Sequence, residues 1–176
     1  MIASRSAYFT VPPTPDTGAI STTSSSTAST PCVTQIAGLV TAHVLCANVT
    51  TVAFPGKSTA SASVADATVV GITGVPTITM RVVKSTSTTT CAGSSGTTTI
   101  EFLQVGSTVV ATTNVAPNTH LTVEGVALVL NEQIPFSTPD KGLTVNAVHA
   151  TVNAASGVAQ TNLIVASSES DIGNCP

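Results

Sequence analysis

Apolar and polar residues alternate in short runs along most of this chain. The clearest example is Gly125–Val152, where two runs rich in valine and leucine, Val126–Leu130 and Leu143–Val152, flank a connection rich in proline, glycine and charged residues. This composition is typical of a β-hairpin with a long loop. Strand alternation predicts that Leu143 and Val145 oppose the valine and leucine residues of the first run. We therefore predict that this hairpin lies at the centre of one sheet.

Similar runs predict further strands on both sides of the hairpin. No window of 12 or more residues carries an apolar stripe with helical spacing, so we expect almost no helix. The Ser/Thr-rich segment Lys84–Gly96 is interpreted as a low-complexity connection. The fold class that follows is all-β, an antiparallel β-sandwich of jelly-roll or immunoglobulin-like kind with an extended N-terminal arm. The further strands are predicted at Val33–Phe54, Ser58–Val70, Val75–Val83, Thr97–Val105, Val109–Thr113, Thr119–Val123 and Val158–Ser170.

The first 31 residues differ from the rest of the chain. They include Ile2, Tyr8, Phe9 and Val11, which precede three closely spaced prolines, and they also include the Ser/Thr linker 21–30. We interpret 1–31 as an arm with a linker and 32–176 as the sandwich domain. Aromatic residues belong in contacts that bury them. The arm is therefore either a disordered tail or a segment that docks as an added strand on its own domain or on a neighbouring subunit.

Composition narrows the classes of function. The chain is 176 residues long, 52 of which are serine or threonine, and only 7% are charged, with a net charge of −3. The five basic residues are scattered, which excludes the clustered basic patch that nucleic-acid binding requires. No apolar run approaches the length of a membrane span. A surface with so few charges repels other copies weakly, which favours association between sheet edges.

Four cysteines, Cys32, Cys46, Cys91 and Cys175, are widely spaced and form no CxxC motif. Their even number in an all-β chain predicts two structural disulfides and a secreted, extracellular protein. Four cysteines allow three pairings, and spacing does not choose among them. The N-terminal sequence lacks the apolar segment of a signal peptide, so if the protein is secreted, this numbering describes either a processed form or a recombinant version.

Candidate catalytic and metal-ligating residues are few. His43 and Cys46 form an HxxC pair, but residues three apart on a strand point to opposite faces unless a bulge intervenes, which argues against zinc. His120 and His149 lie in predicted strands without a GxSxG motif, which argues against a serine hydrolase. We predict no enzyme activity, no catalytic residue, no metal and no cofactor.

Two weaker signals concern calcium and sugar. Glu169 and Asp171 could share a strand face near Asn174, but no loop motif supplies the further oxygens that calcium prefers. Asn48 begins an Asn-Val-Thr sequon, which makes a glycan a candidate modification or partner. Asp140 is most simply a turn residue.

Two short strings in the second half of the chain are distinctive, VLNEQ at 129–133 and VNAVH at 145–149. Together with other segments, they resemble the choice-of-anchor P family of secreted bacterial β-proteins. The resemblance implies a secreted or surface-exposed β-domain without known catalysis. It also implies that Cys91 and Cys175 correspond to cysteines recurrent in the family, which leaves Cys32 for Cys46 or for another chain. The arm lies outside the resemblance. The segments that carry the resemblance are Ile36–Thr50, Thr97–Val110, Gly125–Pro135, Gly142–Val152 and Leu163–Pro176.

Together these observations predict an extracellular structural protein that self-assembles into a fibre, filament or surface layer. The arm would dock on a neighbouring subunit as a donor strand, and contacts of that head-to-tail kind propagate. The alternative is a monomeric cell-surface binding or adhesion domain that uses the loops Lys84–Gly96 and Ile134–Lys141.

Overall fold

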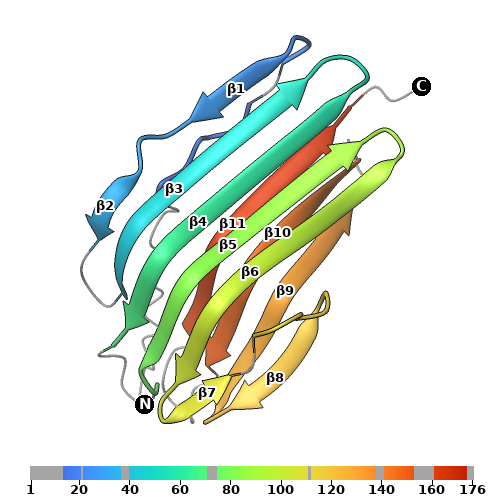
Figure 1. Ribbon diagram of the computed structural model, residues 1–176. Helices are drawn as coiled ribbons and strands as arrows, with labels where there is room; N and C mark the ends of the chain where they lie inside the picture. The colour runs from blue at the N-terminus through green and yellow to red at the C-terminus, as the bar shows by residue number, and fades with distance from the viewer. Residues whose placement is uncertain are drawn as a thin grey trace, which may run out of the picture.

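The structure is a computed structural model, and it describes residues 14–20, 22–36, 40–70, 75–110, 112–137, 141–152 and 161–173. The arm residues Ile2, Tyr8, Phe9 and Val11, and also Cys175, lie outside the described residues. Within the described part of the chain every regular element is a strand, and two antiparallel sheets pack face to face (Figure 1). This confirms the predicted β-sandwich and the expectation of almost no helix.

Sheet A is the wider layer, with the order β1-β3-β4-β5-β6-β7, and β2 pairs with β3 beside β1. From β2 to β7 each strand pairs with the next one along the chain, whereas β1 pairs with β3. Sequence analysis placed 26–29 in a Ser/Thr linker, but these residues form β1 and extend the sheet. The strands are β1 (Ser26–Ser29), β2 (Val33–Ile36), β3 (Val40–Val52), β4 (Lys57–Val69), β5 (Ile78–Thr90), β6 (Gly93–Val105) and β7 (Thr108–Val110).

Sheet B has the order β11-β10-β9-β8, again a meander, and lies behind sheet A in Figure 1. Each sheet is thus completed before the next begins, in contrast to the Greek-key connections of jelly-roll and immunoglobulin folds. The predicted central hairpin is confirmed as β9 and β10. Its register differs from the prediction, because Leu143 pairs with Pro135 and Val148 with Leu130. The strands are β8 (Thr119–Val123), β9 (Val126–Phe136), β10 (Lys141–Val152) and β11 (Thr161–Ile172).

The segment Lys84–Gly96 is not a connection. Most of it belongs to two long paired strands, β5 and β6, which turn at 91–92. Ser85, Ser87 and Thr89 point inward and are completely buried. The intervening threonines are only half-buried, in keeping with the alternate face of the sheet. The alternative hypothesis of a binding domain used Lys84–Gly96 as a loop, but most of these residues belong to strands of the sandwich.

Each sheet changes its side-chain alternation along one row of neighbouring residues, and we call the two rows together the crease. Val44, Val82, Asn131 and Ala166 have φ values between 46° and 54° there, in the left-handed region. Pairing on either side keeps the same register but skips the residues at this level. In sheet A two successive residues of a strand then face outward. Valine rarely adopts this conformation, so long pairing on both sides must hold Val44 and Val82 in it.

The crease divides the core into two unlike halves. On one side large apolar side chains such as Met80, Leu103 and Leu128 are almost completely buried. On the other side the sheets pack through small residues, and a Cβ atom at Gly96 would lie 2.5 Å from Cγ2 of Val145. Serine, threonine and glycine predominate in this half, beside the buried Leu143 and Val145, and the sheets approach each other closely at Gly96. Its buried polar members are Ser58, Ser85, Ser87, Thr89, Ser168 and Ser170.

A disulfide joins Cys32 to Cys46, with a Cα–Cα distance of 4.4 Å. It lies one position beyond the Val33–Leu45 pair and so fastens the start of β2 to β3. Cys91 is also disulfide-bonded. The predicted use of cysteines as disulfides is thus confirmed for Cys32 and Cys46.

Candidate functional site

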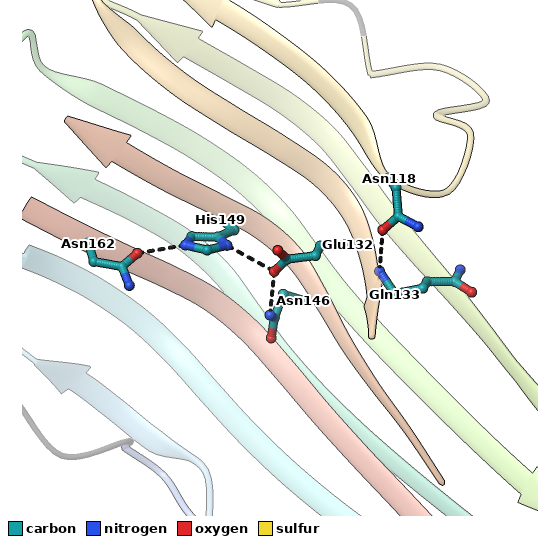
Figure 2. A network of polar contacts seen from close by, with 6 residues as sticks. All are labelled: Asn118, Glu132, Gln133, Asn146, His149 and Asn162. Atoms are coloured by element: carbon teal, nitrogen blue, oxygen red, sulfur yellow. Dashed lines mark hydrogen bonds and ion pairs between the residues drawn. The ribbon is translucent and has the colours of Figure 1, made fainter. Parts of the chain in front are cut away.

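The strings VLNEQ and VNAVH meet on neighbouring strands of sheet B (Figure 2). The Glu132 carboxylate on β9 accepts a hydrogen bond of 2.7 Å from Asn146 Nδ2 on β10. The same carboxylate oxygen lies 2.9 Å from Nδ1 of His149, which is also on β10. Nε2 of His149 lies 2.6 Å from Oδ1 of Asn162 on β11. We call these four residues the Glu132 cluster, which connects three strands by side chains.

The residues on either side of Glu132 reach to other parts of the fold. The Asn131 amide donates to the Val115 carbonyl at 3.1 Å. The Gln133 amide donates at 3.0 Å to the carbonyl of Gly96 on β6, in the opposite sheet. The backbone N–H of Gln133 donates to Oδ1 of Asn118, as Figure 2 shows. The string VLNEQ therefore ties β9 to a loop and to sheet A.

The environment lowers the pKa of Glu132 below its ordinary value. Burial of the carboxylate raises this pKa, but hydrogen bonds from Asn146 and His149 outweigh it, together with the positive charges of His149 and His120. The carboxylate is therefore ionised at neutral pH and holds its donors in place.

This arrangement is better suited to structure than to catalysis. A histidine that serves as general base must offer a ring nitrogen to a nucleophile or a substrate. Both ring nitrogens of His149 face oxygen atoms of neighbouring side chains, Glu132 and Asn162. These partners hold the imidazole between three strands, which is the role of a polar cross-link in a sheet.

Removing the charge of Glu132 should make stability less dependent on pH. Because its folded pKa is lowered, ionised Glu132 stabilises the fold fully above its unfolded pKa, and this contribution is lost as the pH falls through the folded value. We expect Glu132→Gln to cost about 1–2 kcal/mol at pH 7, and the difference from the parent to shrink as the pH falls below the ordinary glutamate pKa of 4.5. Urea denaturation of both proteins from pH 7 to pH 3 measures this. A difference that stays constant with pH would contradict it.

The matched control for this experiment is Glu169→Gln. Glu169 is an exposed carboxylate of sheet B that accepts a hydrogen bond from the Thr144 hydroxyl. Because surface substitutions of this kind usually change stability by less than about 0.5 kcal/mol, this variant should follow the parent protein.

The HxxC pair lies at the crease of sheet A. His43 Nδ1 lies 2.5 Å from Oδ1 of Asp66. The left-handed backbone at Val44 resets the alternation of β3, which places His43 and Cys46 on the same outer face. This change of alternation removes the geometric objection to zinc, but Cys46 is bonded to Cys32 and provides no thiolate.

The row of His43 continues across sheet A. The register aligns Gln35, His43, Asp66, Arg81 and Phe102 on adjacent strands. The Arg81 guanidinium lies over the Phe102 ring, 5.5 Å from its centroid, a cation–π geometry. The few charged residues of this sheet face thus concentrate at the crease.

The remaining predicted site residues are dispersed. Asn48 is half-buried in β3, and its Oδ1 accepts a hydrogen bond of 3.4 Å from Thr50. Glu169 and Asp171 lie two apart on β11, whereas Asn174 and Asp140 fall outside the described residues. Among the residues that the structure describes, no group of three or more His, Cys, Asp or Glu side chains is placed to hold a metal ion.

The surface formed by the described residues includes two open hollows. One, of about 380 Å³, lies between β7 and β8, the free edges of the two sheets at one side of the sandwich. The other, of about 500 Å³, has Ser94, Phe136 and Lys141 among its lining residues. The sequence predicted neither, although the second adjoins the loop Ile134–Lys141 of the alternative function.

The Glu132 cluster was not recognised from the sequence, although Glu132, Asn146 and His149 lie in the strings VLNEQ and VNAVH, which had been noted for the family resemblance. A polar pair such as Asn131 and Glu132 between two apolar runs is the available signal. Over the described ranges, no helix is long and apolar enough to cross a membrane. Comparisons with known protein families, with characterised proteins and with solved structures found no match.

Proposed function

We propose that this protein is an extracellular structural subunit that assembles with copies of itself into a fibre, filament or surface layer. The observation that carries the proposal is the position of the arm. The chain enters sheet A through β1, an edge strand, while Tyr8 and Phe9, two of five aromatic residues, precede the sandwich. Apolar side chains on a segment joined to a sheet edge are suited to β-strand addition on a neighbour.

The disulfides support an extracellular location. The Cys32–Cys46 bridge and the oxidised state of Cys91 are compatible with a secreted protein. The resemblance to the choice-of-anchor P family, carried by its short strings, points to the same location. A low density of charge, 7% of residues, makes repulsion between assembled copies small.

Electron microscopy of the full chain, with arm variants, tests this proposal. The purified protein should form regular filaments or layers, and deletion of residues 1–20 should leave a folded monomer. The full-length variant Phe9→Ser, Val11→Ser should also be monomeric, because it removes the apolar side chains while keeping the chain length. Assembly that persists unchanged in both variants would refute the role of the arm.

A monomeric binding or adhesion domain is the second candidate, and the hollow beside Phe136 favours it. Phe136 lies over Gly142, where a Cβ atom would meet the ring at 2.1 Å, so the aromatic side chain is held in place. Lys141 adds a positive charge to the same hollow. A glycan array that gives a clear signal, abolished by Lys141→Ala, would establish this reading. A parent protein without any signal would remove it.

A further inference from the structure

The hollow between β7 and β8 is an uncharged, largely apolar groove. Val109 on β7 is 62% exposed, although it is a large apolar residue. The lining of the groove also includes three residues that pack partly buried against the core, Val115, Leu121 and Val123. None of the ten lining residues is charged. An exposed valine in such a lining marks a surface that a second apolar group can cover.

Hydrogen bonds hold the groove open at a fixed width. At one end, Oε1 of Glu124 in the β8–β9 turn accepts three bonds of 2.9 Å, from the N–H and hydroxyl of Ser107 and the hydroxyl of Thr108. These bonds join the β6–β7 turn to sheet B and lower the pKa of Glu124. The approach is close, because a Cβ atom at Gly106 would lie 1.8 Å from Oε2 of Glu124.

The other end of the groove is fastened to β9. Asn118 donates its N–H to the Asn131 carbonyl at 2.9 Å, and the Asn131 side chain holds the Val115 carbonyl. The Thr119 hydroxyl donates to the Ala116 carbonyl at 2.8 Å. With both ends fixed, the groove exists before any ligand arrives, as binding sites usually do.

Two free strand edges border the groove. Among the described strands β7 pairs with β6 alone, and β8 with β9 alone. Each therefore presents backbone N–H and C=O groups along its other edge. An extended segment laid in the groove could pair with either edge and place alternate side chains on the apolar lining.

We propose that the occupant of this groove is the arm of a second copy of the chain. This assignment rests on the proposed self-assembly and adds the acceptor site. Ala7–Val11 has the five residues of β8, carries no charge, and ends at Pro12 and Pro13, which cannot donate to a ladder. In an extended strand Phe9 and Val11 share one face and would enter the groove, while Tyr8 points away.

The strand order gives a contact between two copies a direction. The chain enters sheet A at β1, and the groove lies at β7 on the opposite edge, with four strands between them. Five strand spacings amount to about 24 Å. An arm that leaves one edge and a groove at the other give a head-to-tail contact, which repeats without closing.

Assembly of full-length variants tests the acceptor site. Val109→Arg places a charge in the groove at an exposed position, so the monomer should still fold. We expect its critical concentration for assembly to rise at least about tenfold. The matched control is Ile164→Arg, since Ile164 is 46% exposed on sheet B and should leave assembly unchanged. Filaments formed equally well by Val109→Arg would overturn the assignment and leave the proposed function standing.

Cysteine cross-linking identifies the source of the arm. Full chains carrying Phe9→Cys are mixed with full chains carrying Val109→Cys, and oxidised products are separated without reductant. A disulfide-linked dimer of the two variants is expected. A chain that carries both Phe9→Cys and Val109→Cys gives an answer even if the proposed assembly fails altogether. A bridge formed only within one chain would overturn the assignment to a second copy.

Discussion

Replacing Leu103 with alanine is expected to lower the free energy of unfolding by about 2–5 kcal/mol. Leu103 has no exposed surface and lies in the half of the core built from large side chains, with Ile78, Met80 and Leu128. The paired strands of both sheets restrict how far neighbours can move to fill the space, so a cavity remains. Chemical denaturation measures the loss, with an unchanged slope against denaturant showing that the unfolded state is the same.

Ser85→Ala is the matched comparison in the other half of the core. Ser85 is also completely buried, and its hydroxyl has no hydrogen-bond partner among the described residues. Because a buried hydroxyl without a partner is itself unfavourable, its removal should be neutral or slightly stabilising. A loss above about 1 kcal/mol would contradict this and show that the hydroxyl is satisfied, for example by ordered water. Equal losses in both variants would refute the division of the core.

Removing the disulfide by Cys32→Ala and Cys46→Ala is expected to cost about 2–4 kcal/mol. The bridge closes a ring across a sequence separation of 14, for which loop-closure entropy predicts roughly 3 kcal/mol. The four-residue strand β2 pairs with β3 at only three positions, and the bridge lies next to these pairs. Without the bridge, β2 should open before the rest of the sandwich.

Denaturation and hydrogen exchange together measure this effect. The global transition gives the loss in free energy, and amide exchange of Val33 and Gln35 reports the opening of β2. Reductant applied to the double variant controls for the disulfide of Cys91. Unchanged exchange in β2 with an unchanged global transition would show that strand pairing alone holds this edge.

If the groove between β7 and β8 accepts the arm of a neighbouring copy, the hydrogen bonds at the two ends of the groove serve to keep it open for that arm. The three bonds to Glu124 and the bonds around Asn131 keep the free edges apart at a constant width. Glu132 lies on β9, as Asn131 does, and the Glu132 cluster connects this strand to β10 and β11. The polar network of sheet B thus supports the acceptor site, and a variant such as Glu132→Gln should affect stability before it affects assembly.

The sequence by itself determined the class of structure and many of its strands. β-branched residues and short-period alternation favour strands over helices, and the central hairpin of sheet B followed from two apolar runs around a turn-rich connection. These features depend on each residue and its near neighbours. Local sequence therefore suffices for them.

Tertiary structure decided which residues are buried where the sequence shows no contrast between apolar and polar positions. It also decided which residues far apart in the sequence become neighbours. Alternation failed at Lys84–Gly96 because serine and threonine occupy both faces of β5, so no apolar signal marks the buried positions. The crease shifted the face of residues beyond Val44 and Val82, which the strict period of two does not anticipate.

The functional surfaces are also products of the fold. Glu132 and Asn162 are 30 positions apart in sequence but meet at His149, because β9, β10 and β11 lie side by side. The groove exists because the two sheets end in β7 and β8, whose free edges no local pattern brings together. A strand's own residues encode its conformation, but only packing of the two sheets determines which edges and side chains become neighbours.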